Sequence, residues 1–130
     1  MAALGDSFML PKPGHEVEHL WVLITNPDPQ THEAIMVNVT TLRPHSDTTI
    51  VLNPGDHPFI QRPSVIFYAD ARTVDTRLLD AAVQRGAYSG NAAFQAAVVV
   101  VRIQAGLAAS PFTPRKIKAA FAAYFAAGLT

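Results

Sequence analysis

The hydrophobic pattern of the chain changes near residue 73, and this change limits the folds open to it. Before that point, short runs of β-branched and bulky apolar residues alternate with turns rich in proline and glycine, which is typical of antiparallel strands. From Val74 onward the apolar residues repeat with a helical period. The sequence therefore predicts an α+β fold, mainly β over residues 1–72 and mainly α over residues 73–130.

Length and composition place the chain among globular proteins. Its 130 residues are 49% apolar and 15% charged, enough apolar surface for a stable core. The first residues lack the basic start and long apolar run of a signal peptide, and Gln95 and Arg102 interrupt the most apolar stretch, 92–103. We therefore expect a single cytoplasmic domain that does not contact a membrane. The sequence has no cysteine, which excludes disulfides and thiolate chemistry.

The first half is expected to form a small curled sheet. The predicted strands are residues 17–25, 33–41, 48–52 and 64–70, and the turns between them are 26–32, 42–47 and 53–58. Gly55 in the last turn is free to adopt a positive φ. A run of short antiparallel strands of this length generally closes into a small barrel whose open end is covered by helices.

Three helices are expected in the second half. The first follows Val74 and ends at Gly86, the second runs from a cap at Asn91 to Gln104 and ends at Gly106, and the third begins after Thr113 and ends at Gly128. Their predicted buried residues are Leu78, Leu79, Ala82 and Val83 in the first helix and Ile117, Phe121, Tyr124 and Phe125 in the third.

The segment His15-Glu16-Val17-Glu18-His19 fits the H-E-x-x-H pattern of zinc proteases. That pattern works only on a helix, where residues four apart share one face and their imidazoles reach one zinc ion. Here prolines and a glycine precede the motif, and it continues directly into the strand-like run LWVLIT. On a strand the two histidines lie about 13 Å apart, too far for one metal. We therefore expect no metal site and no cofactor.

The charges are unevenly distributed along the chain. All ten acidic residues lie in residues 1–80 with five of the basic ones, and residues 81–130 carry the other five basic residues and no acid. The basic half can provide a binding surface for RNA, because Lys and Arg neutralise the charge of phosphates. Alternatively, the two halves attract each other within one fold or one dimer.

Several short segments resemble one known family. They are the glutamate, histidine and strand EHLWVLIT, the strand AIMVNVTT, the segment HPFI, and SVIFYADARTVDTRLL, in which residues 69–75 match the latter half of a DQ-x-R-T-[IV]-D segment. Over residues 14–86 the chain resembles the MazF/PemK-like toxins of bacterial toxin–antitoxin pairs. The resemblance implies an SH3-like barrel with added helices, and a homodimer that cleaves single-stranded RNA without metal and is blocked by an antitoxin protein.

The catalytic positions of that family are only partly matched. Thr40 and Thr41 stand where the family has a threonine or serine pair after its second strand. Glu18 and His19 stand where an arginine and a proline are usual, and Phe67 and Ala69 replace an arginine and an acid that some members use.

Histidines offer a substitute for the missing groups. All five, His15, His19, His32, His45 and His57, lie in the first 57 residues, and histidine is the side chain best suited to proton transfer near neutral pH. We hypothesise a ribonuclease site with His19 as base, His57 as acid, and Thr41 and Arg72 on the phosphate. Thr40, Arg43 and Arg62 are the further candidates for RNA binding.

Each of these residues also has a structural interpretation. His57 is then a turn residue hydrogen-bonded to backbone, His19 a strand residue paired with a carboxylate, and Arg72 part of a strand-to-helix corner in which Asp75 stabilises the helix start. Aromatic residues can stack on bases, but Trp21, Phe67 and Tyr68 also suit the core.

Two classes of function are therefore open. The first is a metal-independent endoribonuclease of the toxin kind, or a diverged relative of one. The second is a catalytically inert module that binds a protein or nucleic-acid partner through the same groove. Signatures of other enzymes are missing, because the sequence has no glycine-rich phosphate loop and Ser64 has no G-x-S-x-G context.

Overall fold

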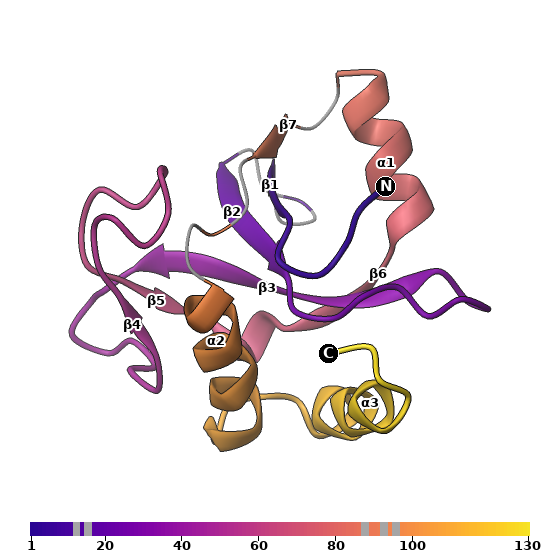
Figure 1. Ribbon diagram of the computed structural model, residues 1–130. Helices are drawn as coiled ribbons and strands as arrows, with labels where there is room; N and C mark the ends of the chain where they lie inside the picture. The colour runs from indigo at the N-terminus through magenta and orange to yellow at the C-terminus, as the bar shows by residue number, and fades with distance from the viewer. Residues whose placement is uncertain (12–13, 15–16, 87–88, 92–93, 95–96) are drawn as a thin grey trace.

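The computed structural model describes residues 1–11, 14, 17–86, 89–91, 94 and 97–130 (Figure 1). Seven strands, one 3-10 helix and three α-helices follow each other along this part of the chain. They are β1 (Ser7–Pro11), β2 (Glu18–Leu23), β3 (Glu33–Thr41), β4 (Val51–Leu52), β5 (Ser64–Ile66), η1 (Tyr68–Asp70), β6 (Arg72–Asp75), α1 (Thr76–Gln84), β7 (Ser89–Asn91), α2 (Ala97–Ala109) and α3 (Arg115–Ala126).

All strand pairs are antiparallel and belong to one sheet, in the order β4-β5-β3-β2-β1-β7. The long strand β3 organises this sheet, because its first half also pairs with β6 and its last three residues pair with β5. Across the described strands no pairing joins β4 to β7, so the sheet is open. The predicted α+β class is confirmed, whereas closure into a barrel is not seen.

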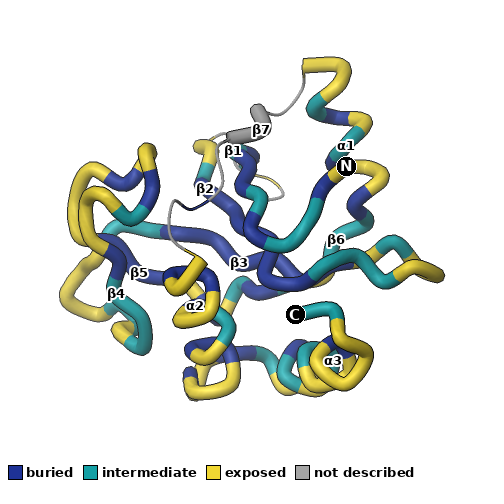
Figure 2. Tube along the Cα trace, viewed as in Figure 1, coloured by how far each residue is buried: buried dark blue, intermediate teal, exposed yellow. Residues whose placement is uncertain are grey.

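Helices cover both faces of the sheet. Ile35 and Val37 of β3 pack in a cluster with residues of α2 and α3, and Ala34 and Met36 pack in a second cluster with Leu79 of α1. Figure 1 shows α1 on one side of β3 and the two C-terminal helices on the other. The central strands are buried, and much of the chain between β3 and β5 is exposed (Figure 2).

Several predicted strands differ from the observed ones. The predicted strand 33–41 has the observed bounds of β3, and the segment 17–25 shortens to β2. The segment 64–70 does not stay extended: it forms β5 and then η1. The strands β1, β6 and β7 were not predicted, because they are short and depend on pairing with distant segments.

The helices also correct the prediction in detail. Gly106 does not end the second helix but lies inside α2, and Asn91 belongs to β7. Leu78 and Phe125, predicted to be buried, are 68% and 70% exposed. Thr113 does not cap α3, because its hydroxyl donates to Leu107 O at 2.7 Å. The longest of the described helices, α2, has 13 residues, and none of the described helices is long and apolar enough to span a membrane.

Candidate functional site

Strands β2 and β3 separate at one end of the sheet and leave a pocket there. Their pairing stops at Leu20 opposite Val39. β2 begins two residues before this pair and β3 continues two residues beyond it. The overhanging residues of β2 pair only with β1, and those of β3 with β5. Each strand is therefore held by its outer neighbour while the space between the two remains open.

The four overhanging residues, Glu18, His19, Thr40 and Thr41, line this pocket, whose volume is about 410 Å³. Its size falls in the range of small-ligand sites, about 300–1,000 Å³. We call it the strand-end pocket. Its other lining residues are Met9, Val17, Leu20, Val39, Arg43, Phe59, Ile60, Gln61, Arg62 and Ser64.

The lining of the strand-end pocket favours an anion. Two exposed arginines, Arg43 and Arg62, contribute positive charge, and Glu18 contributes one negative charge. The pocket therefore carries a net charge of +1 with His19 neutral and +2 with His19 protonated. A guanidinium has planar donors that match phosphate oxygens, and the two threonine hydroxyls can add further hydrogen bonds.

The segment 59–62 forms one wall of the pocket, and His57 anchors the turn that precedes it. This histidine is 1% exposed, and its Nε2 lies 3.0 Å from Ser7 Oγ on β1. Its Nδ1 accepts the Phe59 N–H at 3.1 Å. Because Nδ1 accepts, the neutral ring carries its proton on Nε2. His57 thus has the backbone hydrogen bond expected of a turn histidine, and it does not line the pocket.

Five of the seven site residues predicted from the sequence line the strand-end pocket. His19, Thr40, Thr41, Arg43 and Arg62 all line it. His57 and Arg72 do not, so the convergence of two histidines and Arg72 that we hypothesised is not found.

Arg72 lies elsewhere on the sheet, in β6. Its guanidinium carbon is 5.0 Å from the centre of the Trp21 ring, and its Nε donates to Asp70 O at 3.2 Å. It lines a separate pocket of about 270 Å³ together with Lys116. The corner that follows fits the structural interpretation, because Asp75 caps α1 by accepting the Arg77 N–H at 2.9 Å.

The remaining histidines lie apart from this site or outside the described residues. His32 occupies a turn with φ of 62°, His45 is exposed in the loop after β3, and His15 and Glu16 of the H-E-x-x-H segment fall outside the described residues. His19 belongs to β2, so the end of that segment is extended. Within the described ranges, no three His, Asp or Glu side chains are grouped to hold a metal ion.

Nine of the lining residues were not predicted as site residues from the sequence, and three of them, Glu18, Phe59 and Gln61, offer a charged, aromatic or amide group to a ligand. Phe59 is 55% exposed although it is large and apolar, and Ile60 beside it is buried. The order HPFIQR was a signal for Phe59 and Gln61, because polar and aromatic residues surround one aliphatic residue there. Trp21 and Tyr68, in contrast, are 1% and 0% exposed and belong to the core as expected, whereas Phe67, for which the core was also expected, is 37% exposed.

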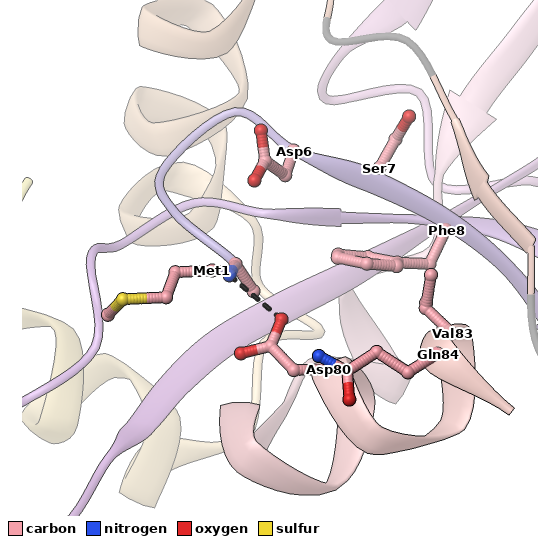
Figure 3. A pocket seen from close by; sticks show the side chains of 8 residues that line it. Met1, Asp6, Ser7, Phe8, Asp80, Val83 and Gln84 are labelled. Carbon is pink, nitrogen blue, oxygen red and sulfur yellow. Dashed lines mark hydrogen bonds between the residues drawn. The ribbon is translucent and has the colours of Figure 1, made fainter.

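A third pocket, of about 360 Å³, lies between the N-terminal segment, β1 and α1 (Figure 3). Its two carboxylates hold the N-terminal backbone: Asp80 accepts the Ala2 N–H at 3.0 Å and Asp6 accepts the Ala3 N–H at 2.9 Å. None of the nominated residues lines this pocket. Its acidic groups thus have a structural role, and the strand-end pocket is the better candidate site.

Comparison with protein-family descriptions, curated proteins and solved structures finds no match to this chain. The functional assignment therefore depends on the geometry and chemistry of the strand-end pocket.

Proposed function

We propose that the strand-end pocket binds single-stranded RNA and cleaves its backbone without a metal ion, as an endoribonuclease of the toxin kind or a diverged relative. The observation that carries the proposal is the grouping of His19, two threonines and two arginines around one opening. These residues come from three separate segments of the chain, the start of β2, the end of β3 with its following loop, and the segment before β5.

The proposed reaction is an internal transphosphorylation. His19 accepts the proton of the ribose 2′-hydroxyl, and the 2′ oxygen attacks the adjacent phosphorus. The bond from phosphorus to the 5′ oxygen breaks, and this oxygen takes a proton from water. Arg43 and Arg62 stabilise the negative charge that develops on the phosphorane, while Thr41 donates a hydrogen bond to a phosphate oxygen. The products are a 2′,3′-cyclic phosphate and a 5′-hydroxyl.

The resemblance to the MazF/PemK-like toxins supports this assignment at the level of fold. We propose that the curled sheet from β2 to β5 is an open form of the SH3-like barrel of that family. The support is the order of the segments, in which a long strand, a second strand ending in Thr40-Thr41, and a later strand leading into a helix follow one another. The antitoxin partner is part of the same proposal.

Cleavage of a long single-stranded RNA, with and without chelator, tests the proposal. We expect cleavage that resists chelator and leaves cyclic phosphate ends detectable by mass spectrometry. His19→Ala should reduce the rate by about 10²- to 10⁴-fold, the usual contribution of a general base. Arg62→Gln should slow cleavage and weaken binding, with a lower dependence of affinity on salt.

His45→Ala is the matched control for His19→Ala, because His45 is exposed and does not line the pocket. It should leave the cleavage rate unchanged. His57→Ala is not suitable, because it removes a buried anchor of the pocket wall. Absence of cleavage at every pH between about 5 and 9, where histidine titrates, would reject the ribonuclease.

A binding module without catalysis is the second candidate. The observation in its favour is that His57 is buried, which leaves His19 as the one histidine among the described lining residues. This candidate predicts RNA binding that weakens in Arg43→Gln and Arg62→Gln without any cleavage by the wild type. Growth arrest on expression, relieved by the product of a neighbouring gene, would instead support the toxin role.

A further inference from the structure

Phe59 is an exposed aromatic residue placed on the strand-end pocket. Its side chain is 55% exposed and lines the pocket together with Gln61 and Arg62. The residue between them, Ile60, is 5% exposed and belongs to the main core cluster. Over these four residues the chain thus inserts one side chain into the core and presents the other three at the surface.

The position of Phe59 is fixed from behind by the buried His57. The Phe59 N–H donates to His57 Nδ1 at 3.1 Å, and the Ile60 N–H donates to His57 O at 2.9 Å. The centroids of the His57 and Phe59 rings lie 5.9 Å apart, and the interplanar angle is 36°. The His57 ring in turn packs on the Phe94 ring, with 4.8 Å between the ring centroids. An aromatic ring supported in this way loses little conformational freedom when a ligand binds to it.

The neighbours of Phe59 supply the polar contacts that a nucleotide needs. The Gln61 amide offers both a donor and an acceptor, which is the pattern that reads the edge of a base. Arg62 and Arg43 offer guanidinium groups for the phosphate next to that base. Stacking, base-edge and phosphate contacts therefore lie together on one opening.

We infer that Phe59 is a stacking platform for one unpaired base of the RNA and that Gln61 reads the edge of this base. The inference rests on the proposed function and adds its selectivity to it. A base paired within a duplex is stacked on both sides and cannot lie on the Phe59 ring, so the pocket accepts single strands in preference to duplexes.

The test compares RNA with a polyanion that has no bases. A short fluorescent 2′-O-methyl oligoribonucleotide, which cannot be cleaved, and an inorganic polyphosphate of similar charge are titrated at one salt concentration. Stacking of one base contributes a factor of roughly 5 to 150 in affinity. Phe59→Leu should lower the affinity for the oligonucleotide by about this factor and leave polyphosphate binding unchanged, and Phe59→Tyr should retain the wild-type affinity.

Phe112→Leu is the matched control, because Phe112 is 61% exposed and does not line the pocket. It should bind both polyanions like the wild type. Gln61→Leu should reduce the differences in affinity among homopolymers. Oligonucleotide binding that is equal in Phe59→Leu and the wild type overturns the inference while the proposed function stands. Failure of the wild type to bind either polyanion overturns the proposed function, and the inference with it.

Discussion

At the scale of single residues, Gly106 illustrates how a contact can reverse an expectation from sequence. A glycine after a run of helical residues usually ends the helix, yet here α2 continues through it to Ala109. The Tyr68 hydroxyl donates to Ile103 O at 2.7 Å, one turn earlier in the same helix. A Cβ at position 106 would collide with that hydroxyl and lie 2.8 Å from Tyr68 Cζ. Gly106 therefore allows the tyrosine ring to approach the helix backbone.

Two opposite effects determine the outcome of Gly106→Ala. Helix propensity alone predicts a gain in stability of about 1 kcal/mol. The collision with a fully buried ring predicts a loss of about 1–3 kcal/mol, since neither partner has room to move. We expect a net decrease in the free energy of unfolding, measured by urea denaturation.

The partner of the collision can be tested in the same way. In the double variant Gly106→Ala/Tyr68→Phe, removal of the hydroxyl should relieve part of the strain, so the two effects should not add. A Gly106→Ala variant as stable as the wild type would contradict the close packing. Burial also raises the pKa of Tyr68, so this hydroxyl stays protonated and available as a donor.

At the scale of elements, Asp47 and Ser110 connect the loop after β3 to the end of α2. The buried Ser110 hydroxyl donates to Asp47 at 2.6 Å, and Thr49 donates to the same carboxylate through its hydroxyl at 2.6 Å and its N–H at 3.0 Å. Partial burial is the largest influence on the pKa of Asp47 and raises it. The hydrogen bonds from Ser110 and Thr49 together outweigh burial and hold the pKa below its usual value.

This arrangement predicts a stability difference that depends on pH. Ser110→Ala should lower the free energy of unfolding at pH 7 by about 1–3 kcal/mol, because the hydrogen bond has a charged acceptor. The folded-state pKa of Asp47 is depressed, so its stabilisation is present above the unfolded value near 3.9 and is lost as the pH falls through the folded value. The deficit of Ser110→Ala should therefore shrink below about pH 4.

Urea denaturation at pH 7 and at about pH 3 measures this change. In an Asp47→Asn background, Ser110→Ala should have the same effect at both pH values, because the titrating acceptor has been removed. An equal deficit at both pH values in the Asp47 protein would show that the carboxylate charge does not contribute.

Elements with a strong local pattern could be predicted from the sequence, and those made by pairing could not. β3 is a nine-residue run rich in β-branched residues, and its predicted bounds are correct. β6 has the sequence RTVD, which reads equally well as a turn, and it is extended because it pairs with the first half of β3. The same holds for β1, whose partner β2 lies beyond a proline-rich segment.

The candidate site was predictable in part for the same reason. Residues at the ends of recognised strands, such as His19 and Thr41, could be placed near each other because β2 and β3 form a hairpin. His57 and Arg72 could not be placed, since their side-chain directions depend on Ser7 and Trp21, which lie far away in sequence.

At the scale of the whole molecule, the charge asymmetry does not locate the site. Arg43 and Arg62 of the strand-end pocket both belong to the acidic half, residues 1–80. In the basic half, Arg102 donates to Val51 O at 3.3 Å, and Lys116 lines the pocket that holds Arg72. The halves are thus interleaved in space, but the Arg72–Asp70 and Arg77–Asp75 ion pairs both lie within the acidic half.

A homodimer remains a prediction, and α2 offers the surface for it. This helix is apolar around most of its circumference, with Val98 and Val101 being 62% and 58% exposed on the side away from the core. A helix of that kind is normally buried on more than one side. We expect a dimer in sedimentation velocity experiments and a monomer for Val101→Asp. A wild-type monomer at high concentration would refute the prediction.

The separation of β2 from β3 also affects how the site can evolve by substitution. The opening lies where the backbone pairing of β2 with β3 stops, and exposed side chains such as Gln61 and Arg62 line it. Substitutions of these exposed residues can therefore alter selectivity or abolish chemistry with little loss of stability, whereas Leu20, Val39 and Ile60 of the same lining also belong to the core. Two more residue pairs hydrogen-bonded between β2 and β3 would close the strand-end pocket, and every activity that depends on it would be lost.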